Sequence, residues 1–397
     1  MDARSPRLLA AFLAAVCVFL AGPATAAAGT ATRPTADPSA ATPSKPRSGP
    51  PPEGIAPDGS TVGGGRLATR GVLTADGAPP LPAGIGAKGW LVADAGTGRV
   101  LGARDPHGRY YPASTLKTLL LLTLQPLLDP HRVVVGTAQD ENIEGSRVGL
   151  VRGGRYPVAL LFQALVLQSG NDAANALART AGGVPVTVAA MNETAAAIGA
   201  YDTVAGTPSG LDVAGQSSSP YDLALIFRRL LARPDAAAVL RLPAARMPAV
   251  PGRGPGFQIQ SQNPLLRTYR GDLGGKTGFT DAARHTYVTA AGRGGRRIVE
   301  SLMDTENRPV YFGVQAARLL DWGFSVPRHT VGVGVLVDSG ALAPAGQGGH
   351  DPHRTPGTAA SAFPPTGVPG GLATLGALVV VAAVGGALWR ARRASSP

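Results

Sequence analysis

Residues Arg109 to Leu122 read "RYYPASTLKTLLLL", and their leucine-rich half predicts a buried helix from about Ser114 to Leu128. Ser114 and Lys117 are three positions apart, so a helix places both side chains on one face of its first turn. Lysine is scarce in this arginine-rich chain: the 37 basic residues include only four lysines, Lys45, Lys88, Lys117 and Lys276. A buried lysine can lose its proton whereas arginine cannot, so Lys117 is a candidate for acid–base chemistry.

Two further short motifs follow in order along the chain. Ser169-Gly170-Asn171 lies between two predicted helices, and Lys276-Thr277-Gly278 begins a predicted strand. A serine hydroxyl is a poor nucleophile without a base, and a buried lysine near a second cation can be that base. The helix start at Ser114 also offers unpaired N–H groups and a partial positive charge to a developing oxyanion.

Each motif alone has an ordinary structural explanation. Ser114 would be a helix cap, Asn171 a turn residue and Lys276 a charge at a strand edge. The ordered triple, in a chain with so few lysines, instead indicates a nucleophilic serine. A second Ser-x-Asn at Ser261-Gln262-Asn263 lies in a predicted strand and loop, and we expect it to be unrelated to the site.

The remaining pattern predicts strands at both ends of one domain and helices between them. We expect a hairpin at 90–94 and 99–103, helices at 157–168, 172–181, 186–198 and 219–231, strands at 276–279, 285–291 and 297–303, and a closing helix at 308–322. This order predicts a sheet built from both ends of the domain, beside a separate helical lobe.

The N-terminus has the layout of a secretory signal peptide, predicted at 1–26. Arg4 and Arg7 precede an apolar run over 8–20, and Ala24-Thr25-Ala26 follows. The single cysteine, Cys17, lies inside this run, so the mature chain is expected to have no disulfide, thiolate nucleophile or cysteine metal site. The Pro-, Gly- and Ala-rich residues 27–80 are predicted to be a disordered stalk before the catalytic domain at 81–326.

The C-terminus is predicted to anchor the protein. A Pro- and Gly-rich linker at 327–370 precedes an apolar run at 371–389, which is long enough to cross a membrane, and a basic tail at 390–397. By the positive-inside rule the tail is cytoplasmic and the catalytic domain lies outside the cell. Phe363 to Gly367 resembles a sortase sorting signal with Phe in place of the usual Leu, so attachment to the wall stays open beside a retained membrane anchor.

The net charge of +12 would suit an anionic wall polymer or lipid surface. Nucleic acid is not indicated, because aromatic residues are 5% of the chain and the arginines are scattered rather than clustered with them.

Four stretches together resemble the low-molecular-mass D-alanyl-D-alanine carboxypeptidases, penicillin-binding proteins of serine peptidase family S11, in their actinobacterial form. They are "YPASTLKTLLLL", "EGSRVGLVRGGRYPVALLFQALVLQSGNDAANALA", "TPSGLDVAGQSSSPYDLALIFRRLL" and "GGKTGFTDAARHTYVTAA". The resemblance covers about 85–325. It implies the α/β fold of penicillin-binding proteins and β-lactamases, with an antiparallel sheet flanked by helices and a helical lobe.

The resemblance also implies roles for the motif residues. Ser114 would attack the peptide bond between two D-alanines, Lys117 would take its proton, and Ser169 would relay a proton to the leaving amine. Asn171 would hold the substrate amide and Lys117. Lys276 would keep Lys117 neutral.

The third motif would bind the end of the substrate. Lys276, Thr277 and Gly278 would hold its terminal carboxylate, and the N–H groups of Ser114 and Phe279 would form the oxyanion hole. The implied substrate is a peptidoglycan stem peptide ending in D-Ala-D-Ala, with β-lactam antibiotics as covalent inhibitors. Neither a metal nor a cofactor is implied.

One departure and three alternatives remain. Gln216 stands where family members often have His, so its role is open. A D,D-endopeptidase that cleaves cross-links would use the same residues. A class A β-lactamase would need a deacylating glutamate, which the surroundings of Glu193 do not supply. A non-catalytic peptidoglycan-binding paralogue would not need the intact motifs.

Overall fold

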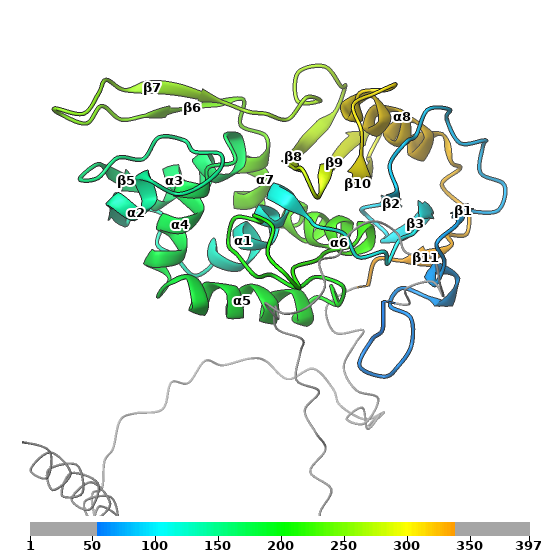
Figure 1. The fold of residues 1–397 in the computed structure, drawn as a ribbon. Coiled ribbons are helices and arrows are strands. Elements are labelled where there is room, and N and C mark those ends of the chain that lie inside the picture. Colours follow the sequence, from blue (N-terminus) through cyan, green and yellow to red (C-terminus); the bar gives the residue numbers. More distant parts are fainter. Residues whose placement is uncertain (1–53, 338–397) are drawn as a thin grey trace, which may run out of the picture. The chain divides into compact units, whose positions relative to one another are not determined.

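A seven-stranded antiparallel sheet forms the centre of the protein, whose computed structural model describes residues 54–337. The strand order is β1-β3-β2-β10-β9-β8, with β11 added beside β3 (Figure 1). The bounds are β1 (Val72–Thr74), β2 (Gly89–Asp94), β3 (Arg99–Arg104), β8 (Asp272–Thr280), β9 (Arg284–Arg293), β10 (Arg296–Thr305) and β11 (Gly334–Val335). Because β2 pairs with β10, the prediction of one sheet from both ends of the domain is confirmed.

Helices cover both faces of this sheet. Along β2, Trp90 and Val92 pack in the same hydrophobic cluster as α8 (Phe312–Ser325), whereas Leu91 and Ala93 pack in the cluster that contains α6 (Pro220–Leu231). This alternation follows from the two-residue period of a strand. Helix α8 begins at Phe312 and not at the predicted Arg308, since the residue before a proline disfavours helical geometry and Pro309 follows.

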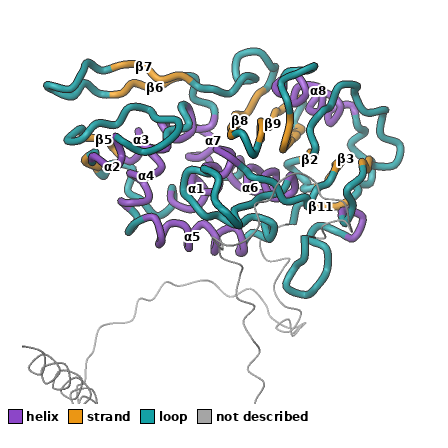
Figure 2. Tube along the Cα trace, in the orientation of Figure 1, coloured by secondary structure: helices purple, strands orange, loops and turns teal. Residues whose placement is uncertain are grey.

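A helical lobe lies beside the sheet (Figure 2). Its helices are α1 (Lys117–Leu124), α2 (Ala138–Glu141), α3 (Val158–Leu167), α4 (Asn171–Thr180), α5 (Val184–Ala197) and α7 (Pro234–Leu240). Two hairpins, β4 (Val133–Val135) with β5 (Arg155–Pro157) and β6 (Ala244–Met247) with β7 (Phe257–Gln260), complete it.

Helix α1 is the apolar centre of this lobe. All eight of its residues are buried, as its apolar sequence predicts. It ends at Leu124, short of the predicted Leu128, because Pro126 has no N–H to donate and its ring would clash with the carbonyl of Leu122.

The folded domain extends beyond the predicted boundaries at 80 and 327. Strand β1 pairs with β3, and Leu67, in the short 3-10 helix η1 (Gly65–Leu67), is fully buried. At the other end the Leu336 N–H donates to Gly98 at 2.7 Å. Residues 54–80 are therefore not a disordered stalk, and 327–337 are not a free linker. The sequence missed this because backbone pairing over two or three residues leaves no periodic pattern.

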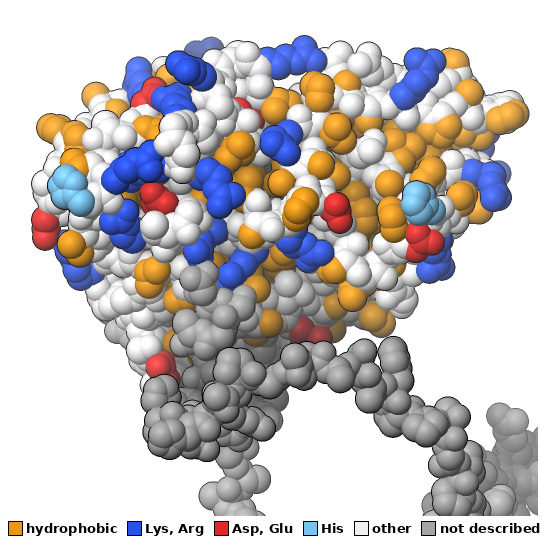
Figure 3. Space-filling view, turned by 180° about the vertical axis from the view of Figure 1, so that it is seen from behind, with side chains coloured by type: hydrophobic (Ala, Val, Ile, Leu, Met, Phe, Trp, Pro, Cys, Tyr) orange, Lys and Arg blue, Asp and Glu red, His pale blue; other side chains and the backbone are white. Residues whose placement is uncertain are grey.

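The predicted signal peptide, the C-terminal apolar run, the basic tail and the Phe363 to Gly367 motif all lie outside the described residues. Within 54–337, no helix is both long and apolar enough to span a membrane. Figure 3 shows the basic side chains of one face of the domain dispersed among apolar and neutral ones.

Candidate active site

Ser114 lies on a 3-10 helix, η2 (Ala113–Leu116), that leads directly into α1, where an α-helix was expected. A 3-10 helix has three residues per turn, so it aligns Ser114 with Lys117. Lys117 Nζ lies 2.8 Å from Ser114 Oγ. Ala113, just before the serine, has a φ of +46°, a conformation that costs a non-glycine residue about 1–3 kcal/mol and is typical of functional sites.

Lys117 is buried, with only 1% of its surface exposed. Its Nζ donates to Asn171 Oδ1 and to the Ser209 carbonyl, each at 2.7 Å. Burial lowers the pKa of Lys117 well below its usual value, the positive charge of Lys276 lowers it further, and Asp172 opposes both. The sequence predicted both causes, burial and a second cation, and burial is the larger of the two.

The second motif lies between α3 and α4, as predicted. Ser169 has a φ of +58°, and its Oγ accepts a hydrogen bond from Lys276 Nζ at 3.0 Å. Asn171 is held at both ends of its amide, because Nδ2 donates to the Glu144 carbonyl at 2.7 Å while Oδ1 faces Lys117. These bonds fix the side chains of both motif residues.

The third motif lies on β8, the edge strand of the sheet. A Cβ on Gly278 would lie 2.8 Å from the backbone N of Ser114, so only glycine lets β8 come this close to η2. Lys276 is 2% exposed, its Nζ donates to the Thr277 carbonyl at 2.7 Å, and burial lowers its pKa to about 7.

These segments enclose a cavity of about 290 Å³. It is lined by Ser114, Ser146, Ser169, Gln262, Thr277, Gly278, Phe279, His285 and Phe312. Lys117 is hydrogen-bonded to Ser114 and Lys276 to Ser169, two of the three lining serines, and Asn171 is bonded to Lys117. The structure thus brings all eight predicted site residues to one place, on segments as far apart in the chain as η2 and β8.

The second Ser-x-Asn has a structural role. Asn263 donates to Asp272 at 3.1 Å and accepts from the Tyr287 hydroxyl, which braces the start of β8. Gln262 nevertheless lines the cavity, which the sequence did not indicate.

The loop over 206–211 supplies a contact that sequence reasoning missed, the Ser209 carbonyl on Lys117. Next to it, Gly210 has a φ of +85°, and a Cβ there would lie 1.9 Å from the Ala113 carbonyl. The loop is braced by buried Gln216, which accepts from the N–H groups of Gly206 and Thr207 and donates to the Leu211 carbonyl. This bracing gives Gln216 a structural role in the loop. The contact of the Ser209 carbonyl with Lys117 could not be predicted, because a backbone carbonyl leaves no signature in the sequence.

Asp172 is a second missed residue, and it positions one wall of the cavity. It is fully buried, and its carboxylate accepts the N–H groups of Val148, Gly149 and Leu150 at 2.8 to 2.9 Å. This fixes the segment that follows Ser146. The negative charge of Asp172 also partly offsets the lowering of the Lys117 pKa that burial and Lys276 cause.

Replacing Asp172 by asparagine is therefore expected to have two effects. Lost hydrogen bonds to a charged group should lower the free energy of unfolding by about 1.5–3 kcal/mol, measured by urea denaturation. The pKa of Lys117 should also fall, so the acid limb of the pH dependence of acylation should move to lower pH. Glu193→Gln, on the exposed side of α5, is the control. Unchanged stability and an unchanged acid limb would contradict this role.

In this cleft between the sheet and the helical lobe, one serine faces a buried lysine, and a second serine faces a second buried lysine. This arrangement defines a serine acyl-transfer enzyme of the penicillin-binding class. Comparison with known proteins specifies the family. Residues 75–307 match the peptidase S11 family, described as D-alanyl-D-alanine carboxypeptidase. The chain belongs to this family.

Two relatives support the same family. D-alanyl-D-alanine carboxypeptidase DacB2 of Mycobacterium tuberculosis is 45% identical over 262 residues, which cover 64% of this chain and 88% of the relative. Carboxypeptidase DacD of Salmonella typhimurium is 33% identical, and the match covers 62% of this chain and 64% of the relative.

Solved structures agree with the fold. The crystal structure of a D-alanyl-D-alanine carboxypeptidase from M. tuberculosis superposes with a TM-score of 0.63 at 42% identity, covering 66% of this chain and 99% of that one. The Streptomyces K15 DD-transpeptidase gives a TM-score of 0.59 at 25% identity, covering 62% of this chain and all of the other. The predicted family and fold class are confirmed.

Proposed function

We propose that this D-alanyl-D-alanine carboxypeptidase removes the terminal D-alanine from peptidoglycan stem peptides, with Ser114 as the nucleophile. The observation that carries the proposal is the buried Lys117 amine, 2.8 Å from Ser114 Oγ. At that distance it can take the hydroxyl proton directly.

The hydrogen bonds of Lys117 orient it for this step. A neutral amine has two N–H groups and one lone pair. The Asn171 and Ser209 oxygens accept the two N–H groups, so the lone pair faces Ser114 Oγ. Because burial lowers the pKa of Lys117, the neutral form is reached at a lower pH than in an ordinary lysine.

The rest of the cavity matches the later steps. After Ser114 attacks the carbonyl carbon, the N–H groups of Ser114 and Phe279 would hold the oxyanion. Ser169, bonded to Lys276, would pass a proton to the leaving D-alanine. Lys276 and Thr277 would hold the D-alanine carboxylate, and water would then hydrolyse the acyl-serine. The same attack on a β-lactam ring gives a stable acyl-enzyme.

The D,D-endopeptidase and the carboxypeptidase share this machinery, so the deciding experiment compares substrates. Purified full-length protein should release free D-alanine from a stem pentapeptide that ends in D-Ala-D-Ala. Cleavage of cross-linked dimers without release of D-alanine from the pentapeptide would overturn the proposal in favour of the endopeptidase. No observation favours a β-lactamase, and Glu193 is exposed on α5 outside the cavity lining.

The two buried lysines predict a bell-shaped pH dependence of kcat/KM. Activity should rise with pH as Lys117 loses its proton, and the lowered pKa places this limb well below the usual lysine value. It should fall as pH rises through the pKa of Lys276, about 7, because the neutral amine no longer attracts the substrate carboxylate. In Lys276→Arg the alkaline fall should disappear, since arginine stays charged.

Penicillin labelling of Lys276→Arg at acidic pH checks that this variant is folded. An alkaline limb that is identical in Lys276→Arg and wild type would assign the fall to another group.

We further propose that the protein acts outside the cytoplasm, held by its C-terminal segment at 371–389. The signal-peptide pattern, the apolar run and the basic tail support this location. Extraction of the protein from cells tests it. A retained anchor predicts full mass after removal of the signal peptide and a need for detergent. Sortase processing would remove the C-terminal segment and leave the protein on wall fragments, and release in soluble form would contradict both.

A further inference from the structure

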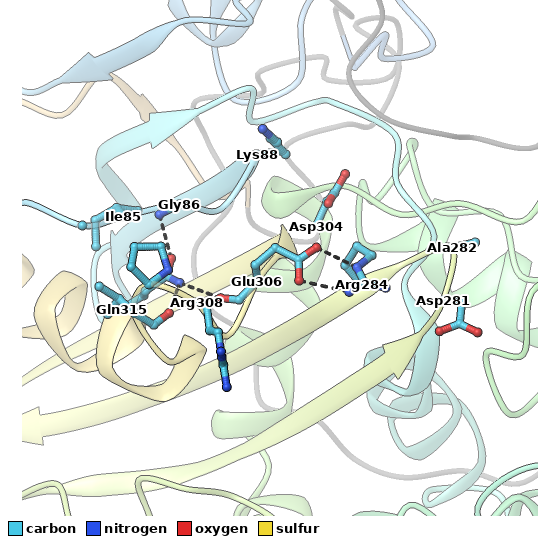
Figure 4. A pocket seen from close by; sticks show the side chains of 13 residues that line it. Ile85, Gly86, Lys88, Asp281, Ala282, Arg284, Asp304, Glu306, Arg308 and Gln315 are labelled. Carbon is cyan, nitrogen blue, oxygen red and sulfur yellow. Dashed lines mark hydrogen bonds and ion pairs between the residues drawn. The ribbon is translucent and has the colours of Figure 1, made fainter.

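Two clusters of charged side chains outside the active site differ in how their charges are matched. One lines a cavity of about 720 Å³ at one end of the sheet (Figure 4). Its charged residues are three cations and three carboxylates, Lys88, Arg284, Arg308, Asp281, Asp304 and Glu306, and Arg284 pairs with Glu306. Because these charges balance, they select no ligand by charge. The other cluster is buried around His107.

His107 is fully buried on the segment 105–112, which leads from β3 into η2. Its Nδ1 lies 2.7 Å from Asp202 Oδ2, and its Nε2 lies 3.0 Å from the Val62 carbonyl oxygen. The Arg109 guanidinium, 3.3 Å from Asp202 Oδ1, keeps the Asp202 carboxylate ionised. Because an ionised carboxylate and a carbonyl can only accept hydrogen bonds, both ring nitrogens of His107 must donate. The geometry therefore makes His107 a protonated, positively charged imidazolium.

The charges around His107 favour this protonated form. Burial by itself lowers the pKa of His107, but the hydrogen bond and charge of Asp202 and the charge of Asp222 outweigh it. The pKa of His107 therefore lies above its usual value of about 6.5. Asp222, on α6, is buried too, and burial raises its pKa to about 7. Its ionisation holds the His107 proton more tightly and so moves the loss of that proton to higher pH.

The other charged groups near His107 do not compete for it. Asp105, on the same segment, lies 3.7 Å from the Arg70 guanidinium. Asp58 is the only charged residue of the N-terminal segment 54–64, and it is exposed. The N-terminal segment thus brings a carbonyl, and no charged side chain, to the imidazolium.

The N-terminal segment folds directly over the His107 ring. A Cβ on Gly54 would lie 2.1 Å from His107 Nδ1, so only glycine lets the segment come this close. The Val62 N–H donates to the Gly54 carbonyl at 2.9 Å, which closes the segment into a loop. This loop lies outside residues 75–307, which match the family. It is fastened to the matched domain through His107.

Helix α6 ties this loop to the other end of the described chain. The Gly63 carbonyl accepts the Val335 N–H at 2.9 Å, so the loop lies beside β11 (Figure 1). The Tyr221 hydroxyl of α6 donates to the Val335 carbonyl at 2.7 Å and accepts the Val337 N–H at 3.0 Å. The Tyr221 ring in turn packs on His107, with ring centroids 4.7 Å apart. His107 therefore contacts the N-terminal loop directly and β11 through Tyr221.

We propose that protonated His107 is a pH-sensitive latch, which holds the N-terminal segment 54–64 and β11 on the domain. When the ring loses one proton, a single N–H remains for two acceptors. The ionised Asp202 is the stronger acceptor, so it keeps this N–H and the hydrogen bond to Val62 is lost. The contribution of the latch to docking is complete below about pH 6.5 and disappears as the pH rises through the pKa of His107.

Hydrogen exchange of the full-length protein between about pH 6 and about pH 9 tests the latch. After correction for the intrinsic pH dependence of exchange, peptides from 54–67 and 333–337 should lose at least about tenfold of their protection, as expected when a charged donor is lost. Helix α8 should keep its protection, because the release is local. A wild-type protein whose 54–67 protection is the same at both pH values would overturn the latch, and so would an equal loss in α8.

His107→Gln assigns the effect to this residue. Glutamine is neutral at every pH, so peptides from 54–67 should be released already at about pH 6 and should show no further change up to about pH 9. His131→Gln removes an exposed histidine of the helical lobe and should behave as wild type. Thermal unfolding checks that both variants keep a cooperative fold, and if His107→Gln does not fold, the wild-type comparison still decides. The wild-type pH-dependent release in a folded His107→Gln would assign the switch to another group and overturn the proposal.

Discussion

Replacing Ser114 by alanine is expected to abolish covalent labelling by a fluorescent penicillin and to lower kcat/KM for D-alanine release by at least about 10⁴-fold. The reason is that, in the proposed mechanism, Ser114 Oγ is the atom that bonds to the substrate carbon in both reactions. Ser169, the other serine bonded to a buried lysine in the cavity, faces Lys276, to which we assign binding of the substrate carboxylate, so we do not expect Ser169 to replace Ser114 as the nucleophile.

Ser261→Ala is the matched control for this prediction. Ser261 belongs to the second Ser-x-Asn, where its Oγ accepts the N–H of Asn263 and no other group from residues 54–337, so this variant should be labelled as strongly as wild type. Thermal unfolding should show that Ser114→Ala keeps the native fold. Equal labelling of Ser114→Ala and wild type would assign the nucleophile to another residue.

Replacing Lys117 by arginine is expected to lower the rate of acylation by about 10²- to 10⁴-fold, the usual contribution of a general base. Arginine keeps the positive charge, but it cannot give up its proton at any accessible pH and so cannot accept one from Ser114. The loss should therefore persist across the whole pH range, measured by single-turnover labelling with penicillin.

The guanidinium is also bulkier than the amine that it replaces in a buried position, so a second variant separates chemistry from folding. Lys117→Met has a similar length without a charge or a base, and it suits a site that is 1% exposed. We expect it to fold and to show the same loss. A folded Lys117→Met with near wild-type acylation would refute the role of Lys117 as the base.

Several elements of the fold followed from local sequence. The hairpin around Gly96, helices α3 to α6 and the three C-terminal strands formed close to their predicted positions, because each has its own apolar period and its own turn or capping residues. The short helices α2 and α7 were not predicted. The errors lay at ends and in short pieces. Pro126 and Pro309 moved two helix boundaries, and the short strands β1 and β11 were missed because their stability comes from pairing with β3.

The sequence by itself determined which residues are candidates for the chemistry. Ser114 and Lys117 are held together by covalent spacing, and the order of the three motifs identified the family before any fold was known. Only the tertiary structure decided their chemical state. Lys276 meets Ser169 from 107 positions away, and the Ser209 carbonyl reaches Lys117 across 92. Burial is the main cause of the lowered pKa of both lysines. It exists only once the sheet and the lobe have packed, because desolvation depends on what surrounds a group in space and not on its neighbours in the chain.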